Sequence, residues 1–131
     1  MIVVDTHIII WHALRPEMLS QKAKDAIDTA NNMDGIIFCG ISLWEIAMLM
    51  HKKRLILDVD YLTFIELIFD SNRYILKGIS PEIADLSSTL FSEYNKDPAD
   101  RIIAATAMVE KAKIVTSDNK LRQSKKIITI W

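Results

Sequence analysis

The stretch Ile2-Val3-Val4-Asp5-Thr6-His7-Ile8-Ile9-Ile10 joins a short β-branched run to an apolar helix-like segment through one aspartate. Ile2 to Val4 has the length and composition of a buried strand. Thr6 is a candidate N-cap for a helix that continues to Leu14. An aspartate that ends a buried apolar strand is costly unless it is paired or bound to a metal ion. Asp5 is therefore the acidic residue that is hardest to explain by structure alone.

The same alternation of short apolar runs and longer helical patterns continues along the chain. Further strands are expected at residues 36–39, 74–79, 114–116 and 127–130. Helices are expected over residues 20–30, 42–50, 60–70 and 97–112, with another that opens at Ser80-Pro81. The strands lack polar alternation, which is typical of parallel strands covered on both faces. The pattern predicts one α/β domain over residues 1–131, a three-layer α/β/α sandwich with a central parallel five-stranded sheet.

The composition is that of an ordinary globular chain. Half of the 131 residues are hydrophobic, a quarter are charged, and the single cysteine, Cys39, excludes an intrachain disulfide bond. The apolar N-terminal stretch has no positively charged region before it, and Asp5 interrupts it. No apolar run approaches the roughly 20 residues that span a bilayer. We expect a cytoplasmic protein without a membrane segment.

The charge pattern bears on nucleic-acid binding. A formal net charge of −1 argues against a protein that holds nucleic acid by bulk charge alone. Basic residues are nevertheless clustered, either as solvated helix ends or as local contacts for phosphate. One cluster covers residues 51–54, and the other comprises Lys111, Lys113, Lys120, Arg122, Lys125 and Lys126.

Four acidic residues are expected at one edge of the sheet. Asp5 and Asp118 follow predicted strands, Glu45 lies in the first turn of the helix after residues 36–39, and Asp100 begins a long helix. Sites in open parallel sheets form beyond the carboxyl ends of the strands, near a switch in strand order. These four acids arrive there from well-separated segments.

Each acid also has a purely structural interpretation. Ser42 and Glu45 match a capping box that closes a helix N-terminus. Asp97, before Pro98, is expected to be a helix cap rather than a ligand. Asp100 can complement the helix dipole, and Asp118 can be a turn residue. Capping does not exclude a place in a site.

A hard divalent cation explains why carboxylates would be gathered. Carboxylates held together raise one another's pKa values unless they are neutralised. Mg²⁺ or Mn²⁺ prefers such oxygen ligands. A zinc site is not expected, because His7, His12 and His51 have no ligand spacing and are attributed to packing or surface positions.

Four motifs resemble those of PIN-domain ribonucleases, in the same order and spacing from end to end of the chain. They are residues 2–11 (I-V-V-D-T-H-I-I-I-W), 41–47 (I-S-L-W-E-I-A), 97–107 (D-P-A-D-R-I-I-A-A-T-A) and 114–121 (I-V-T-S-D-N-K-L). The third and fourth are most similar to VapC-like toxins of type II toxin–antitoxin modules. The resemblance places the family's acidic quartet on Asp5, Glu45, Asp100 and Asp118. It places ligand- or water-orienting polar groups on Thr6, Ser42, Thr116 and Ser117, with Asp97 as an outer acid.

The resemblance implies a ribonuclease dependent on Mg²⁺ or Mn²⁺, an RNA substrate, an antitoxin partner and a homodimer. Residues 43–69 carry much apolar surface, which either serves such partners or packs within the fold. A receiver domain is disfavoured because Thr6, not an acid, follows Asp5. A haloacid-dehalogenase phosphatase is disfavoured because His7 stands where it has its second aspartate. A PIN-like module that binds RNA or protein without cutting it stays as the alternative.

Overall fold

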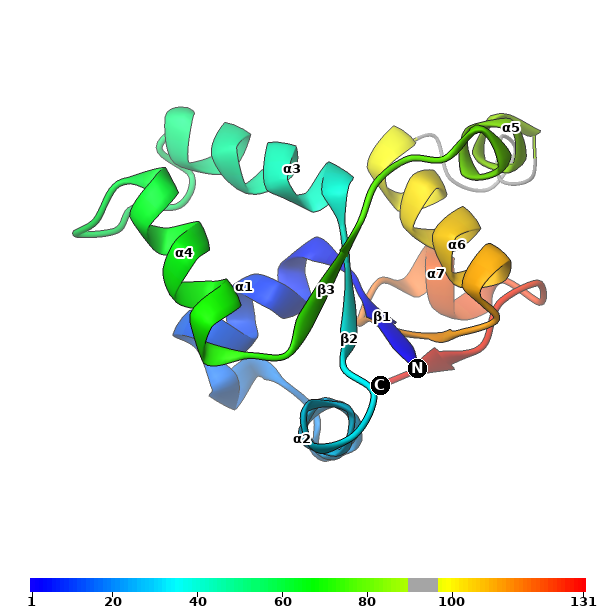
Figure 1. The fold of residues 1–131 in the computed structure, drawn as a ribbon, viewed down its shortest axis with the longest axis horizontal. Helices are drawn as coiled ribbons and strands as arrows, with labels where there is room; N and C mark the ends of the chain where they lie inside the picture. The colour runs from blue at the N-terminus through cyan, green and yellow to red at the C-terminus, as the bar shows by residue number, and fades with distance from the viewer. Residues whose placement is uncertain (90–96) are drawn as a thin grey trace.

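The computed structural model describes residues 1–89 and 97–131, which alternate between strands and helices along the chain (Figure 1). The strands are β1 (Ile2–Val4), β2 (Ile36–Cys39), β3 (Tyr74–Lys77), β4 (Lys113–Val115) and β5 (Thr129–Ile130). The helices are α1 (Thr6–Leu14), α2 (Gln21–Asn32), α3 (Gly40–His51), α4 (Tyr61–Ser71), α5 (Pro81–Thr89), α6 (Pro98–Glu110) and α7 (Asn119–Gln123), with a 3₁₀ turn at Pro16–Met18.

The five strands form one parallel sheet in the order β3-β2-β1-β4-β5. The chain builds outward from β1 to β2 and β3, then returns to the other side of β1 for β4 and β5. The strand order therefore switches between β1 and β4, and the carboxyl ends of these two strands lie at the switch point. Asp5 is the next residue after β1.

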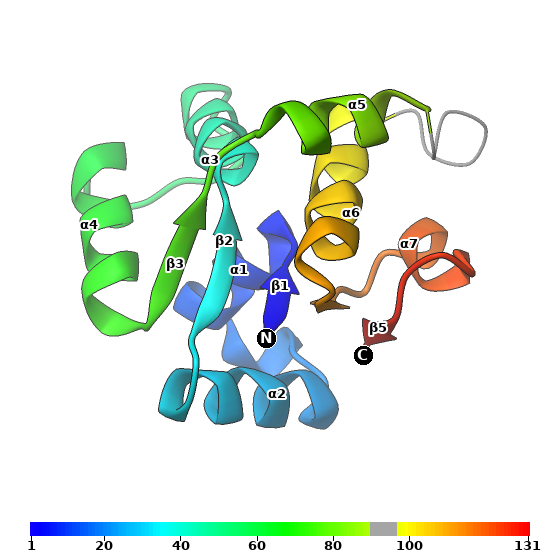
Figure 2. The same cartoon turned by 45° about the vertical axis from the view of Figure 1, so that its right-hand side comes forward.

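Helices cover both faces of this sheet, as predicted (Figures 1 and 2). Alternate side chains of the central strands point to opposite faces. Val4 and Phe38 pack with Ile8 and Phe64 from α1 and α4, whereas Val3 packs with α6 and α7. β1 and β2 are fully buried, and the edge strands β3 and β5 are half-covered. This burial on two faces explains why the strands show no polar alternation.

The element boundaries differ from the sequence-based expectations at several ends. Three strands are shorter or shifted: β3 ends at Lys77, β4 runs from Lys113 to Val115, and β5 begins only at Thr129. α7 was not predicted, because its five residues are too few for a helical period to show in the sequence. Within residues 1–89 and 97–131, no helix is long and apolar enough to cross a membrane.

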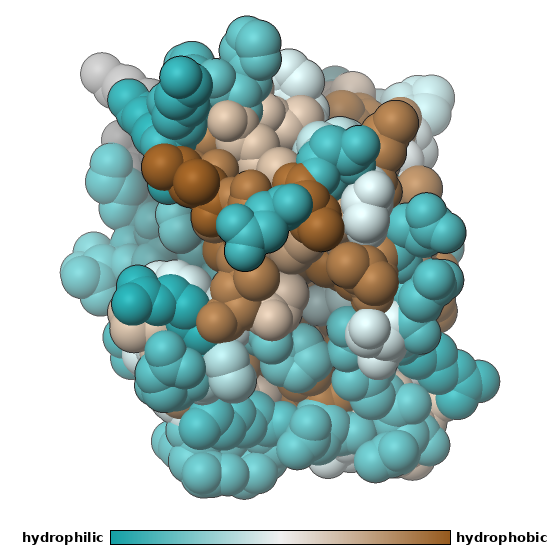
Figure 3. All heavy atoms as spheres, turned by 90° about the vertical axis from the view of Figure 1, so that its left-hand side faces the viewer, coloured by the Kyte–Doolittle hydropathy of each residue, from teal (hydrophilic) through white to brown (hydrophobic). Residues whose placement is uncertain are grey.

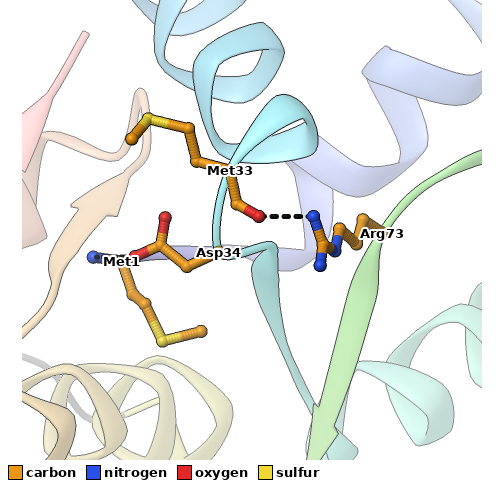
Figure 4. Close-up of polar contacts among 4 residues, drawn as sticks. All are labelled: Met1, Met33, Asp34 and Arg73. Atoms are coloured by element: carbon orange, nitrogen blue, oxygen red, sulfur yellow. Dashed lines mark hydrogen bonds and ion pairs between the residues drawn. The ribbon is translucent and has the colours of Figure 1, made fainter.

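The edge of the sheet opposite Asp5 is held by contacts between segments distant in sequence. Arg73 donates a hydrogen bond to the main-chain carbonyl of Met33 (Figure 4), and the N-terminal amine lies 3.7 Å from the Asp34 carboxylate. Gly35 turns into β2 at φ +93°, where an added Cβ would lie 2.8 Å from the Arg73 carbonyl oxygen. Glycine is therefore required at this turn.

The ends of α3 and α6 share a strained feature that predicts a stabilising substitution. Each helix closes with a lysine in the left-handed region, Lys53 (φ 58°) and Lys111 (φ 53°). At α6, the amides of Lys111 and Ala112 bond back to Met108 and Ala107, the pattern of a Schellman motif. Lys111→Gly should raise the free energy of unfolding by about 0.5–1 kcal/mol, because glycine adopts this conformation without a Cβ penalty.

Thermal and urea unfolding at neutral pH measure this change. Lys111→Ala is the matched control, because it removes the long side chain but keeps the Cβ. An equal gain in Lys111→Ala would assign the effect to the lost charge rather than to the backbone.

Candidate functional site

Five carboxylates line one cavity of about 270 Å³ at the carboxyl ends of β1 and β4, at the switch in strand order. The acids are Asp5, Glu45, Asp97, Asp100 and Asp118. The cavity is also lined by Thr6, His7, Trp11 and Ser117. All four acids that were predicted for the site, and the predicted outer acid, thus meet at the expected edge of the sheet.

Asp5 is buried between β1 and α1. One carboxylate oxygen accepts from the Ile8 amide at 3.2 Å, so Asp5 is the N-cap of α1. The prediction of Thr6 as that cap was wrong, because Thr6 is already the first helical residue. The other oxygen of Asp5 accepts from the Thr116 hydroxyl. Burial raises the pKa of Asp5, and these hydrogen bonds partly oppose that effect.

Thr116 ties the ends of the two central strands together. Its hydroxyl donates to Asp5 at the end of β1 and accepts from the Asp118 amide at 3.0 Å. Thr116 is completely buried, so its hydroxyl is not accessible to solvent. The arrangement fixes Asp5 and the backbone of Asp118 relative to each other, which is the orienting position that the family resemblance gives to Thr116.

A second set of hydroxyls holds Glu45. Thr6 donates to a Glu45 carboxylate oxygen, and its hydroxyl lies 2.8 Å from that of Ser42. Thr6 and Ser42 are buried, while Glu45 is half-buried and faces the cavity. This contact brings α3 to α1 across the edge of the sheet.

The predicted capping box at Ser42 and Glu45 is wrong. α3 begins at Gly40, directly after β2, and its N-cap is Cys39, which makes no side-chain cap hydrogen bond. Ser42 is therefore inside the helix, and Glu45 lies in the second turn rather than the first. A capping box needs Ser42 outside the helix, because its partner amide is three residues further on. The structural explanation for Glu45 is thereby removed.

The electrostatic setting of Glu45 is unfavourable for its charge. Burial raises the pKa of Glu45 most, the hydrogen bond from Thr6 lowers it, and the nearby charges of Asp97 and Asp5 raise it again. Of the described residues that line the cavity, none is lysine or arginine. An added cation would offset this repulsion.

Asp97, Asp100 and Asp118 enter the cavity from the starts of two helices. Asp97 is the N-cap of α6 and accepts from the Ala99 amide at 3.0 Å, as predicted. Asp100 lies in the first turn of α6. The structural alternative considered for Asp118 was a turn residue. Asp118 is instead the N-cap of α7, with the Leu121 amide 3.0 Å from its carboxylate.

The side chains of this cavity fit a hard divalent cation. Among the described residues that line it, most carry a carboxylate or a hydroxyl group, and such cations prefer oxygen ligands. Within residues 1–89 and 97–131, no three Asp, Glu, His or Cys side chains are spaced as a preformed ligand set.

Two aromatic residues of the cavity were not predicted for the site. His7 is exposed and lies against Trp11, with ring centroids 6.1 Å apart. His7 was expected at a packing or surface position, because it has no metal-ligand spacing. Its position two residues after Asp5, at the switch point, was the available signal.

The family model for the PIN domain matches residues 2–127. The chain is 32% identical to the ribonuclease VapC22 of Mycobacterium tuberculosis, over 99% of this chain and 98% of that protein.

Two solved structures share the fold. A VapBC2 complex from Rickettsia felis, bound to promoter DNA, superposes with a TM-score of 0.74 at 15% identity, over 98% of this chain and 97% of that one. A toxin–antitoxin complex from Klebsiella pneumoniae gives a TM-score of 0.67 at 20% identity, over 98% and 97%.

Proposed function

Because this chain belongs to the PIN-domain family, we propose that residues 1–131 form one PIN domain that acts as an endoribonuclease dependent on Mg²⁺ or Mn²⁺. The observation that carries the proposal is the single cavity, at the switch point of the sheet, that five carboxylates line. The relative with 32% identity is named a ribonuclease, which supports RNA as the substrate.

The biological role that we propose is the toxin of a toxin–antitoxin pair. One similar structure is a toxin–antitoxin complex, and another is VapBC2 bound to promoter DNA. A cytoplasmic location fits an RNA substrate and a chain whose one cysteine, Cys39, is free and buried.

An apolar face gives protein partners a place to bind. Phe64 and Ile68 of α4 are buried in the core, but Leu62 and Leu67 on the same helix are 75% and 52% exposed. Figure 3 shows hydrophobic side chains gathered on this side of the molecule. Part of residues 43–69 therefore packs within the fold, and part of it is exposed. We propose that the exposed side of α4, with Leu62 and Leu67, serves the antitoxin and a homodimer contact.

Asp5, Glu45, Asp100 and Asp118 are the residues that would hold the metal ion. When bound, a divalent cation activates water for attack on phosphorus and offsets the charge that develops on the phosphate. The chain's own part is orientation. Thr116 fixes Asp5, while Thr6, supported by Ser42, fixes Glu45.

Ser117 and Asp97 complete the proposed supporting set. Ser117 lines the cavity between Thr116 and Asp118 and can orient water or substrate. Asp97 adds negative charge near Glu45 from its capping position. A module that binds RNA or protein without cutting it is not favoured, because none of the four family acids is replaced and all of them line the cavity.

Cleavage should stop on removal of divalent cations. Purified protein incubated with labelled single-stranded RNA should cut in Mg²⁺ or Mn²⁺ and lose all measurable activity in EDTA, because four carboxylates alone repel the phosphate. Products should carry 5′-phosphate and 3′-hydroxyl ends, since water rather than the ribose 2′-hydroxyl attacks. Full activity in EDTA, or cyclic phosphate ends, would refute this chemistry.

Binding of the cation is measurable without cleavage. A cation that binds only the folded protein at 100 times its dissociation constant adds about 2.7 kcal/mol of stability. The melting temperature should therefore rise with Mg²⁺ or Mn²⁺, and the rise should be absent in Asp5→Asn.

Asp97→Asn should be mild compared with Asp118→Asn. Both residues cap helices, and asparagine caps as well as aspartate, so neither change should unfold the protein. Asp97→Asn should lie at the low end of the roughly 10–100-fold loss that outer ligand-orienting groups cost. Asp118→Asn should be nearly as severe as Asp5→Asn. Equal losses in kcat for both variants would place Asp97 among the ligands.

A further inference from the structure

A second hollow continues from the carboxylate cavity along α3. It has a volume of about 170 Å³ and shares His7 and Glu45 with the carboxylate cavity. At its far end it is lined by Lys52 and Arg54, and on its side by Trp44. We refer to Trp44, Lys52 and Arg54 together as the α3 track.

The helical period explains why these groups share one groove. Trp44, Met48 and Lys52 are spaced by four residues and so lie along one side of α3, beside the stripe that contains Glu45. Seven residues separate Glu45 from Lys52, which is about 10 Å along a helix axis. This spacing leaves room for Lys52 to contact a phosphate other than the scissile one next to the carboxylates.

Arg54 is fixed beside the end of α3 by the backbone. Lys53 takes the left-handed conformation, and the Arg54 amide donates to the Leu49 carbonyl at 2.9 Å while the Lys53 amide donates to Met50 at 3.1 Å. This Schellman motif turns the chain sharply, so Arg54 returns to the groove instead of leading away from it.

The side chains of the α3 track have the chemistry that single-stranded nucleic acid requires. Lys52 and Arg54 are exposed, and in the described part of the chain no ion pair or side-chain hydrogen bond involves either of them. Trp44 is 57% exposed and lines this hollow, so its indole ring is accessible to a ligand there. Cations that follow the backbone, combined with an aromatic platform, are how proteins bind single strands.

We propose that the α3 track is a binding subsite for single-stranded RNA, in which Trp44 stacks on an unpaired base and Lys52 and Arg54 contact phosphates next to the scissile one. The proposal rests on the ribonuclease function proposed above. It explains how a protein with net charge −1 and an acidic cavity holds a polyanion: the local cations stand at one end of the groove.

The test uses a pool of fluorescein-labelled, short single-stranded RNAs of randomised sequence, bound to Asp5→Asn protein so that none is cut. Lys52→Gln/Arg54→Gln should lower the slope of log Kd against log salt by about 1.4, since each lost contact on a single strand removes about 0.7. Trp44→Ala should weaken binding about tenfold, Trp44→Phe should restore most of it, and Trp44→Leu should not. With Asp5 restored, the loss of cleavage should lie in KM rather than kcat.

Lys113→Gln/Lys126→Gln is the matched control, because it removes the same charge from two exposed positions. Lys113 is the first residue of β4 and Lys126 precedes β5, so both lie toward the opposite edge of the sheet. If the α3-track variants bind RNA with the same affinity and salt slope as this control, the proposal is overturned. The groove would then be left as a surface for protein partners. Equal weakening by Trp44→Phe and Trp44→Leu would overturn the stacking role. Absence of any RNA cleavage by the unaltered protein would instead refute the proposed function itself.

Discussion

Asp5→Asn should lower the rate of RNA cleavage by about 10³-fold or more, while the protein stays folded. A divalent cation contributes several kcal/mol to stabilisation of the transition state, and each 1.36 kcal/mol corresponds to a factor of ten in rate. The amide keeps the shape of the carboxylate: its oxygen can still accept from the Ile8 amide, and its nitrogen can donate to the Thr116 hydroxyl. Single-turnover cleavage of labelled RNA in saturating Mn²⁺ measures the loss.

The same variant should be more stable than the wild type at neutral pH. Burial raises the pKa of Asp5 above its ordinary value of 3.8, so the folded protein binds this proton more tightly than the unfolded chain does. Ionised Asp5 therefore costs stability above the folded-state pKa, and the cost disappears as pH falls below the unfolded-state value. Melting temperatures of wild type and Asp5→Asn, measured in EDTA, should converge as the pH is lowered.

Asp60→Asn is the matched control for this experiment. Asp60 also caps a helix, with the Thr63 amide 2.8 Å from its carboxylate, but it is exposed and distant from the cavity. The hydrogen bonds to Thr63 lower the pKa of Asp60, so its substitution should remove stability at neutral pH and leave cleavage intact. Normal cleavage by Asp5→Asn would remove Asp5 from the site.

Glu45→Gln should lose about 10²–10³-fold in cleavage at fixed Mg²⁺, and should recover part of it at much higher Mg²⁺. Glutamine can accept the same hydrogen bond from Thr6 but supplies no negative charge. Because burial and the charge of Asp97 raise the pKa of Glu45, removal of the charge should raise the melting temperature at neutral pH. That gain should shrink as pH falls through the folded-state pKa of Glu45.

A titration of cleavage rate against Mg²⁺, combined with melting curves on the same preparation, decides the role of Glu45. Glu66→Gln, the same change at an exposed position of α4, should alter neither. A Glu45→Gln protein that cuts RNA normally over the whole Mg²⁺ range would reduce the proposed site to three aspartates.

The sequence determined the architecture because its signals are local and repeated. Runs such as Ile36 to Cys39 are apolar on both faces, and such strands separated by helical patterns form parallel sheets with helices on each side. The ends of elements were less determined. Asp5 rather than Thr6 caps α1, and α3 starts two residues before the predicted Ser42. A cap depends on which backbone amides are left free, and β2 passes into α3 without a break.

The sequence by itself also identified the candidate site acids. Asp5, Glu45, Asp100 and Asp118 each lie in a short motif that resembles a PIN-domain motif, and each motif can be recognised without the others. Only the tertiary structure decided what surrounds them. The hydroxyl of Thr6 holds Glu45 from 39 residues away, and that of Thr116 holds Asp5 from 111 residues away. Such contacts depend on strand order, and the same holds for the groove that joins the cavity to Lys52 and Arg54. Local patterns predicted that the acids share one edge of the sheet, but they do not specify which side chains touch there, since those contacts depend on packing over the whole chain.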